Sequence, residues 1–90
     1  MFEIVREDRF LKISKKFLKK HPDLVEKFKQ TVQKLENDPF EPSLKLHKLQ
    51  GNLEKFHAVR LTYEYRIVLV LMIVDEQVIL VDIGTHDEVY

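Results

Sequence analysis

The sequence contains no cysteine and no tryptophan, and only two of its 90 residues are glycine. Without cysteine there are no disulfide bonds, no thiol catalysis and no cysteine-based zinc site, which fits a cytoplasmic protein. Gly51 and Gly84 stand far apart, so no glycine-rich loop is present to hold a nucleotide phosphate. The G-x-S-x-G and H-E-x-x-H motifs of hydrolases and zinc proteases are also absent.

Long apolar segments are missing as well. The longest apolar run covers residues 67–74, whereas a membrane span needs roughly 18–20 apolar residues. The first residues, MFEIVRED, carry acids and no apolar stretch of the kind found in secretory signals. We therefore expect no membrane contact. The hydrophobic content of 44% is normal for a globular chain, so we expect one folded domain over residues 1–90.

Fifteen basic and fifteen acidic residues cancel, but their distribution is uneven. Residues 12–34 carry eight lysines against two acids, a local excess of six positive charges. Residues 75–90 carry five acids and no lysine or arginine. A neutral chain does not favour strong nonspecific binding to nucleic acid, yet a one-sided basic surface permits docking on a polyphosphate. We interpret the helical lysines first as a solvated face, and as the alternative a docking patch for rRNA or DNA.

The first half of the chain has helical periodicity. A short strand is expected over residues 2–5, followed by a helix over 9–20 that Asp8 would cap. Pro22 breaks this helix, and a second one runs to Asn37, with apolar residues at spacings of three and four. The proline-containing segment 37–43 is a loop, so the two helices form a hairpin with a basic outer face.

The second half alternates with the period of strands. Strands are expected over residues 44–49, 56–63, 65–74 and 77–84, with turns at Gly51-Asn52, near Tyr63-Glu64 and at Asp75-Glu76. Residues 65–74 are apolar on both faces, as in a central strand. The pattern predicts an α+β fold of order β-α-α-β-β-β-β, an antiparallel sheet with the helical hairpin packed on one face.

Four residues on neighbouring predicted strands suggest a chemistry. His47, Arg60, Arg66 and His86 would lie on adjacent strands and could share the sheet face opposite the helices. Two imidazoles suit general acid and base catalysis near neutral pH, and arginine binds phosphate oxygens in pairs. This set suits RNA cleavage without a metal or other cofactor, in which the 2′-hydroxyl attacks the adjacent phosphate.

Other interpretations stand beside this one. A strand histidine is often a surface or hydrogen-bonded residue, and we expect this role for His57 and for His21. A metal site of His47, His57 and His86 is conceivable, although no two histidines have the close spacing of typical ligands. The hairpin register is open: a two-residue turn would place Arg60 and Arg66 on opposite faces, whereas a longer or bulged turn would bring them together.

The ordered set LHKLQGNL, AVRLTYEYRIV and ILVDIGTHDEVY resembles the RelE/ParE superfamily of type II toxin–antitoxin toxins, and most closely its RelE and YafQ-like branch. The resemblance implies an endoribonuclease that cuts mRNA in the ribosomal A site. It also implies a cognate antitoxin that wraps the toxin and represses their operon, so a toxin–antitoxin hetero-oligomer on operator DNA is expected.

By the same resemblance, particular residues take roles. His47 is expected to be the base and His86 the acid, with exchange of the two roles left open. Arg60 and Arg66 would hold phosphate. The expected substrate-binding residues are Lys48, Glu64 and the terminal aromatic Tyr90.

Two other functions fit the same fold. One is inhibition of gyrase in the manner of ParE, which needs no histidine pair. The other is a weakly active or inactive homologue that mainly binds antitoxin. Asp87 and Glu88, beside His86, motivate the second alternative, because carboxylates pointing into the groove would repel RNA phosphate.

Overall fold

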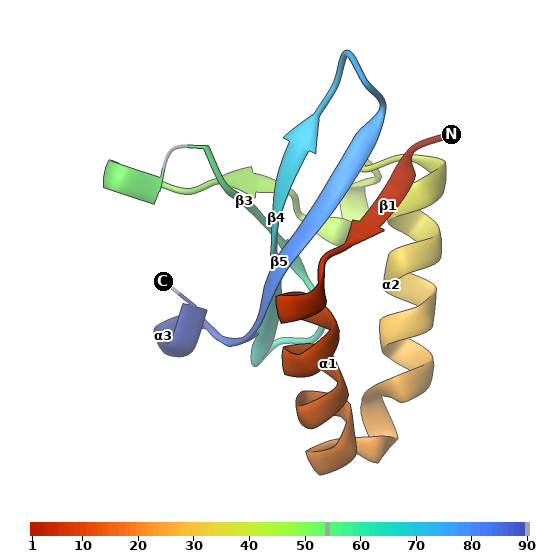
Figure 1. The fold of residues 1–90 in the computed structure, drawn as a ribbon, viewed down its shortest axis with the longest axis vertical. Coiled ribbons are helices and arrows are strands. Elements are labelled where there is room, and N and C mark those ends of the chain that lie inside the picture. Colours follow the sequence, from red (N-terminus) through yellow and green to blue (C-terminus); the bar gives the residue numbers. More distant parts are fainter. Residues whose placement is uncertain (54, 90) are drawn as a thin grey trace.

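The computed structural model describes residues 1–53 and 55–89. Figure 1 shows a strand, two long helices, four further strands and a short terminal helix. The elements are β1 (Glu3–Arg6), α1 (Asp8–Lys20), α2 (Val25–Asn37), β2 (His47–Lys48), β3 (His57–Arg60), β4 (Tyr65–Met72), β5 (Gln77–Thr85) and α3 (His86–Val89). Single 3₁₀ turns lie at Pro22–Leu24, Pro42–Leu44 and Gly51–Leu53. None of the helices in these ranges has the length and apolar character needed to cross a membrane.

The strands form one sheet in the order β1-β5-β4-β3-β2. The α+β class and the helical layer are confirmed, but the sheet is mixed rather than wholly antiparallel. Neighbours from β5 to β2 are antiparallel, whereas β1 runs parallel to β5. The reason is that β1 and β5 are not consecutive in the chain, so no hairpin turn dictates their relative direction.

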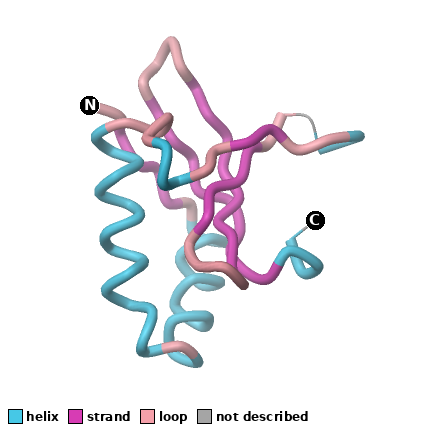
Figure 2. Tube along the Cα trace, turned by 180° about the vertical axis from the view of Figure 1, so that it is seen from behind, coloured by secondary structure: helices cyan, strands magenta, loops and turns pink. Residues whose placement is uncertain are grey.

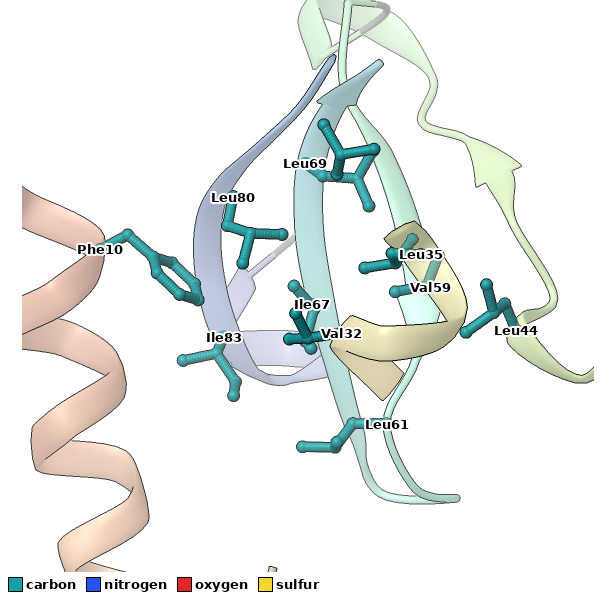
Figure 3. Close-up of a cluster of buried hydrophobic side chains, with 11 residues drawn as sticks. Phe10, Val32, Leu35, Leu44, Val59, Leu61, Ile67, Leu69, Leu80 and Ile83 are labelled. Carbon is teal, nitrogen blue, oxygen red and sulfur yellow. The ribbon is translucent and has the colours of Figure 1, made fainter. Parts of the chain in front are cut away.

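The main core lies between the sheet and the helices α1 and α2. Phe10 on α1 and Val32 and Leu35 on α2 are buried against the inner face of the sheet, and the two α2 residues are three positions apart, as on one face of a helix. Figure 3 shows this cluster, which is completed by buried residues of the strands and their flanking loops: Leu44, Val59, Leu61, Ile67, Leu69, Val78, Leu80 and Ile83.

A smaller core covers the opposite face of the sheet. Leu49, Ala58 and Val68 are buried there, and Val89 of α3 packs against them. Figures 1 and 2 both place α3 and the Gly51–Leu53 turn on this side, away from α1 and α2. Strand β4 is thus apolar on both faces, as predicted, because each face has its own cover.

Several element boundaries differ from the sequence predictions. Helix α1 has Glu7 as its N-cap, without a side-chain capping bond, so Asp8 is the first helical residue rather than the cap. Strand β2 is only two residues long, because the Pro42–Leu44 turn ends in Lys45 with a left-handed φ of 50°. Strand β3 stops at Arg60, and β4 ends at Met72 before a turn over residues 73–76.

Strand β5 contains a bulge that no sequence pattern indicated. Val68 pairs with Asp82 and Leu69 pairs with Leu80, so Val81 is the extra residue. Its carbonyl accepts a hydrogen bond from Arg9 Nη1 of α1 at 3.0 Å. Helix α1 therefore holds the point at which β5 changes register before it leads into α3.

Candidate functional site

His47 and His86, the two predicted catalytic histidines, line one open pocket of about 420 Å³. We call it the histidine pocket; its other lining residues are Lys48, Leu49, Gln50 and Leu53. His47 lies on the edge strand β2, and His86 begins α3. The apolar floor is part of the smaller core, which also anchors α3 through Val89. The structure thus brings together three predicted site residues, His47, Lys48 and His86.

The ring of His47 is oriented by a backbone carbonyl. Its Nδ1 lies 3.0 Å from the carbonyl oxygen of Lys45. A carbonyl can only accept a hydrogen bond, so this geometry favours a proton on Nδ1, and in the neutral imidazole the lone pair is then on Nε2. An imidazole held in this tautomer has the form that a general base requires.

Asp87 and Glu88, the acids that follow His86, are not among the described residues that line the histidine pocket. Asp87 is fully exposed, and its Oδ1 lies 3.6 Å from Nδ1 of His86. Glu88 turns back: its Oε1 accepts the amide of Thr85 at 2.8 Å, while its own amide donates to Thr85 Oγ1 at 3.2 Å. This reciprocal pair is a capping box that starts α3. The hydrogen bond from the Thr85 amide holds the pKa of Glu88 below its usual value.

Gly84 makes room for α3. A Cβ atom at this position would lie 3.1 Å from Glu88 Oε1 and 3.2 Å from Val89 Cγ1, closer than ordinary van der Waals contact. Its backbone is not in the left-handed region, so the residue serves close approach rather than a turn. Glycine therefore lets the last helix fold onto the sheet face that also carries His47.

The two arginines face each other across the hairpin. Arg60 pairs directly with Arg66, which leaves five residues between them and settles the register that the sequence left open. Arg66 Nη1 donates to the carbonyls of Thr62, Tyr63 and Tyr65 at 2.8, 3.0 and 3.2 Å. Arg66 therefore fixes the conformation of the β3–β4 loop.

Arg60 lies outside the histidine pocket. Its guanidinium carbon is 5.6 Å from the centre of the Tyr63 ring, and it lines a separate pocket with Lys27, Ser43, Lys45, Leu61, Thr62 and Tyr63. We call this the cationic pocket. Strand alternation places Arg60 on the same sheet face as His47, but the two line different pockets.

The remaining predicted site residues are more peripheral. Glu64 is exposed in the β3–β4 loop, and its amide is bonded to Thr62 Oγ1 at 3.3 Å. Tyr90 was predicted to bind substrate and lies outside the described residues.

The other histidines are structural. His57 pairs with Lys48, so it faces away from His47, and its Nδ1 is buried with no hydrogen-bond partner among the described residues. Burial, with Lys48 and His47 nearby, lowers the pKa of His57. His21 packs against Phe17 and Tyr65, with ring centres 4.6 and 5.0 Å apart. Within residues 1–53 and 55–89, no three histidine or acidic side chains are grouped to hold a metal ion.

Two features of the site escaped the sequence reasoning. The capping box was readable, because Thr85-His86-Asp87-Glu88 has the T-x-x-E spacing. The cationic pocket had no comparable signal, since Lys27 comes from α2 and meets Lys45 and Arg60 only through the tertiary fold.

Comparison with known proteins gives consistent results. YafQ from E. coli strain BL21(DE3) is 22% identical and superimposes with a TM-score of 0.81, over 100% of this chain and 99% of the other. A metal-bound toxin from Helicobacter pylori is 27% identical, with a TM-score of 0.80 and full coverage of both chains. The YoeB–YefM complex from Staphylococcus aureus contains a chain that is 20% identical, with a TM-score of 0.74 and coverage of 96% and 98%.

A search of curated protein sequences gave no match. The family model of YafQ, described as the bacterial toxin of a type II toxin–antitoxin system, matches residues 2–90. Since this match spans nearly the whole chain and agrees with the fold, the protein belongs to the YafQ family of type II toxin–antitoxin toxins.

Proposed function

We propose that this toxin is a metal-independent, ribosome-dependent endoribonuclease that cleaves mRNA by attack of a 2′-hydroxyl. The observation that carries the proposal is the histidine pocket, in which His47 and His86 come from the two ends of the second half of the chain. The tautomer of His47 supports a role as base, and the exposed ring of His86 supports a role as acid.

The proposed reaction uses each histidine once. Nε2 of His47 takes the proton of the 2′-hydroxyl, and the oxygen attacks the adjacent phosphorus. The bond from phosphorus to the 5′-oxygen breaks, and protonated His86 gives its proton to that leaving oxygen. The products are a 2′,3′-cyclic phosphate and a 5′-hydroxyl. At the end of the reaction His47 carries one more proton and His86 one fewer than at the start.

Positive charge would stabilise the phosphorane. Lys48 is the cation that lines the same pocket as the two histidines. Arg66 on β4 pairs with Gly84 on β5, and Gly84 is two residues before His86 in the chain. We propose that Lys48 binds the scissile phosphate, and that Arg66 contributes both charge and a fixed loop.

The test is cleavage in a translation extract, with mRNA ends mapped by primer extension. The reporter carries a 2′-deoxynucleotide at the mapped position, and the matched control has the same deoxynucleotide three positions away. Loss of cleavage only in the first reporter is expected. Equal cleavage of both reporters would exclude 2′-hydroxyl attack, and inhibition of DNA supercoiling without RNA cleavage would favour the gyrase inhibitor.

We also propose that a cognate antitoxin binds this chain and represses their operon with it. Related toxins have been solved as DinJ–YafQ and YoeB–YefM complexes. The turn between β4 and β5 exposes Ile73 and Val74, apolar residues that a partner would cover. Co-expression with the neighbouring reading frame should yield a co-purifying complex that retards operator DNA, and a toxin that purifies alone would contradict this.

A further inference from the structure

We propose that the cationic pocket is a second RNA subsite, which binds a phosphate and an adjacent base of the strand whose scissile bond lies at the histidine pocket. The inference rests on the proposed function, since it concerns the same substrate. It adds Lys27, Lys45 and Tyr63 to the residues that would contact RNA.

The charge of the pocket matches a phosphodiester. Lys27 of α2, Lys45 after the Pro42–Leu44 turn and Arg60 at the end of β3 line one open space of about 440 Å³. Among the described residues that line it there is no aspartate or glutamate. Ser43, also in the lining, is already bonded to Glu41 and to Lys34 Nζ. Three cationic residues that line one space are a favourable site for one phosphate group.

An aromatic side chain beside these cations distinguishes a nucleotide from a simple anion. Tyr63 is 82% exposed, although its ring lies over the Arg60 guanidinium at 5.6 Å. Its carbonyl accepts from Arg66 Nη1, which fixes the backbone of the loop that presents it. A held, exposed ring next to a phosphate site can stack on an unpaired base.

The walls of the pocket are anchored in the core. Leu44 and Leu61, which precede Lys45 and follow Arg60, are both buried in the cluster of Figure 3. Lys45 is one of two non-glycine residues with positive φ in the described ranges. Such backbone is sparsely populated and persists where the surrounding structure enforces it.

Lys45 also connects the two pockets. Lys45 lines the cationic pocket, while its carbonyl oxygen lies 3.0 Å from Nδ1 of His47. A strand bound by Lys45 is therefore placed next to the residue that orients the proposed base. Acidic protein segments would use the cations but not the Tyr63 ring, so RNA is the favoured ligand.

The test is binding of a single-stranded hexaribonucleotide with 2′-O-methyl groups, which cannot undergo 2′-hydroxyl attack. Amide chemical shifts of the full chain are followed by NMR during titration at several salt concentrations. Binding should shift residues 27, 45 and 60–63. Because the oligonucleotide is not cleaved, the result is readable even if the protein has no nuclease activity.

The variants separate charge from stacking. Lys27→Gln with Lys45→Asn removes two cations, and asparagine tolerates the left-handed backbone at position 45. This double variant should lower the slope of log K against log salt by roughly 1.4, and Tyr63→Leu should weaken binding about fivefold or more. Lys29→Gln, on the same helix but outside the pocket, is the control. Its change in the slope of log K against log salt should be less than half of the change in the double variant.

Three results would overturn the inference. The first is a set of shifts confined to the histidine pocket, and the second is a salt slope that is unchanged in the double variant. The third is equal binding of hexaglutamate that is indifferent to Tyr63→Leu, which would assign the pocket to an acidic protein segment.

Discussion

His47 is the residue on which the proposed chemistry most depends. His47→Asn keeps a side-chain N–H that can donate to the Lys45 carbonyl but has no group that titrates near neutral pH. We expect cleavage in the translation extract to fall by about 10²–10⁴-fold, with thermal unfolding unchanged. His21→Phe, which keeps the ring contacts with Phe17 and Tyr65, is the control and should cleave normally. Full activity of His47→Asn would remove His47 from the mechanism.

Gly84 acts through the space it leaves for α3 rather than through charge. In Gly84→Ala the new methyl group would press on Glu88 and Val89 at 3.1–3.2 Å, so α3 should lift from the sheet. We expect lower helicity at residues 86–89 in NMR shifts, together with slower cleavage. Gly51→Asn is the matched control, because asparagine tolerates the φ of 70° and no atom lies within 4 Å of a Cβ there. An unshifted α3 in Gly84→Ala would contradict this account of the glycine.

The short helix α3 depends on a titrating cap. The pKa of Glu88 in the folded chain lies below the unperturbed value of 4.5, mainly through the hydrogen bond from the Thr85 amide. The cap is therefore fully formed above about pH 4.5 and is lost as the pH falls through the lowered folded-state pKa. The Thr85 amide shift should titrate with a midpoint below 4.5. In Glu88→Gln this titration should vanish, whereas in Asp87→Asn it should persist. A midpoint above 4.5 would mean that the cap does not lower the pKa of Glu88.

At the level of elements, periodicity predicted the helices and the central strand well. Apolar residues at helical spacing on α1 and α2, and an apolar run along β4, need only local reading. The two-residue β2, the bulge at Val81 and the parallel pairing of β1 depend on contacts between distant segments. Register of this kind is set by pairing partners, so a local pattern cannot predict it.

The candidate site was predictable to a similar degree. His47 and His86 share a pocket because the side of β2 that carries His47 and helix α3 lie on one sheet face, as the sequence suggested, and Lys48 also lines this pocket. Arg60 was misplaced because its surroundings depend on the Arg66-bound loop and on Lys27 from α2. Residue chemistry pointed to two histidines that the fold brings into one pocket, while the shape of the backbone decided which cations line that pocket.

For the whole molecule, stability rests on the core between helices and sheet. Leu69 is fully buried at the centre of β4, so Leu69→Ala should lower the free energy of unfolding by about 2–5 kcal/mol. Urea denaturation should show a lower midpoint with an unchanged m value. Val74→Ala, at a position that is 96% exposed, should change stability by less than about 0.5 kcal/mol. A similar loss for both variants would mean that the core lies elsewhere.

The parallel pairing of β1 with β5 has a consequence for synthesis. Glu3 is hydrogen-bonded to the residue before β5 and pairs with Gln77, so β1 cannot join the sheet until the residues of β5 have been translated. The bulge at Val81, the Gly84 contact and His86 all belong to that same late segment. A nascent chain therefore lacks His86 until its sheet can close, and under the proposed mechanism a fragment released before that point would not cleave RNA.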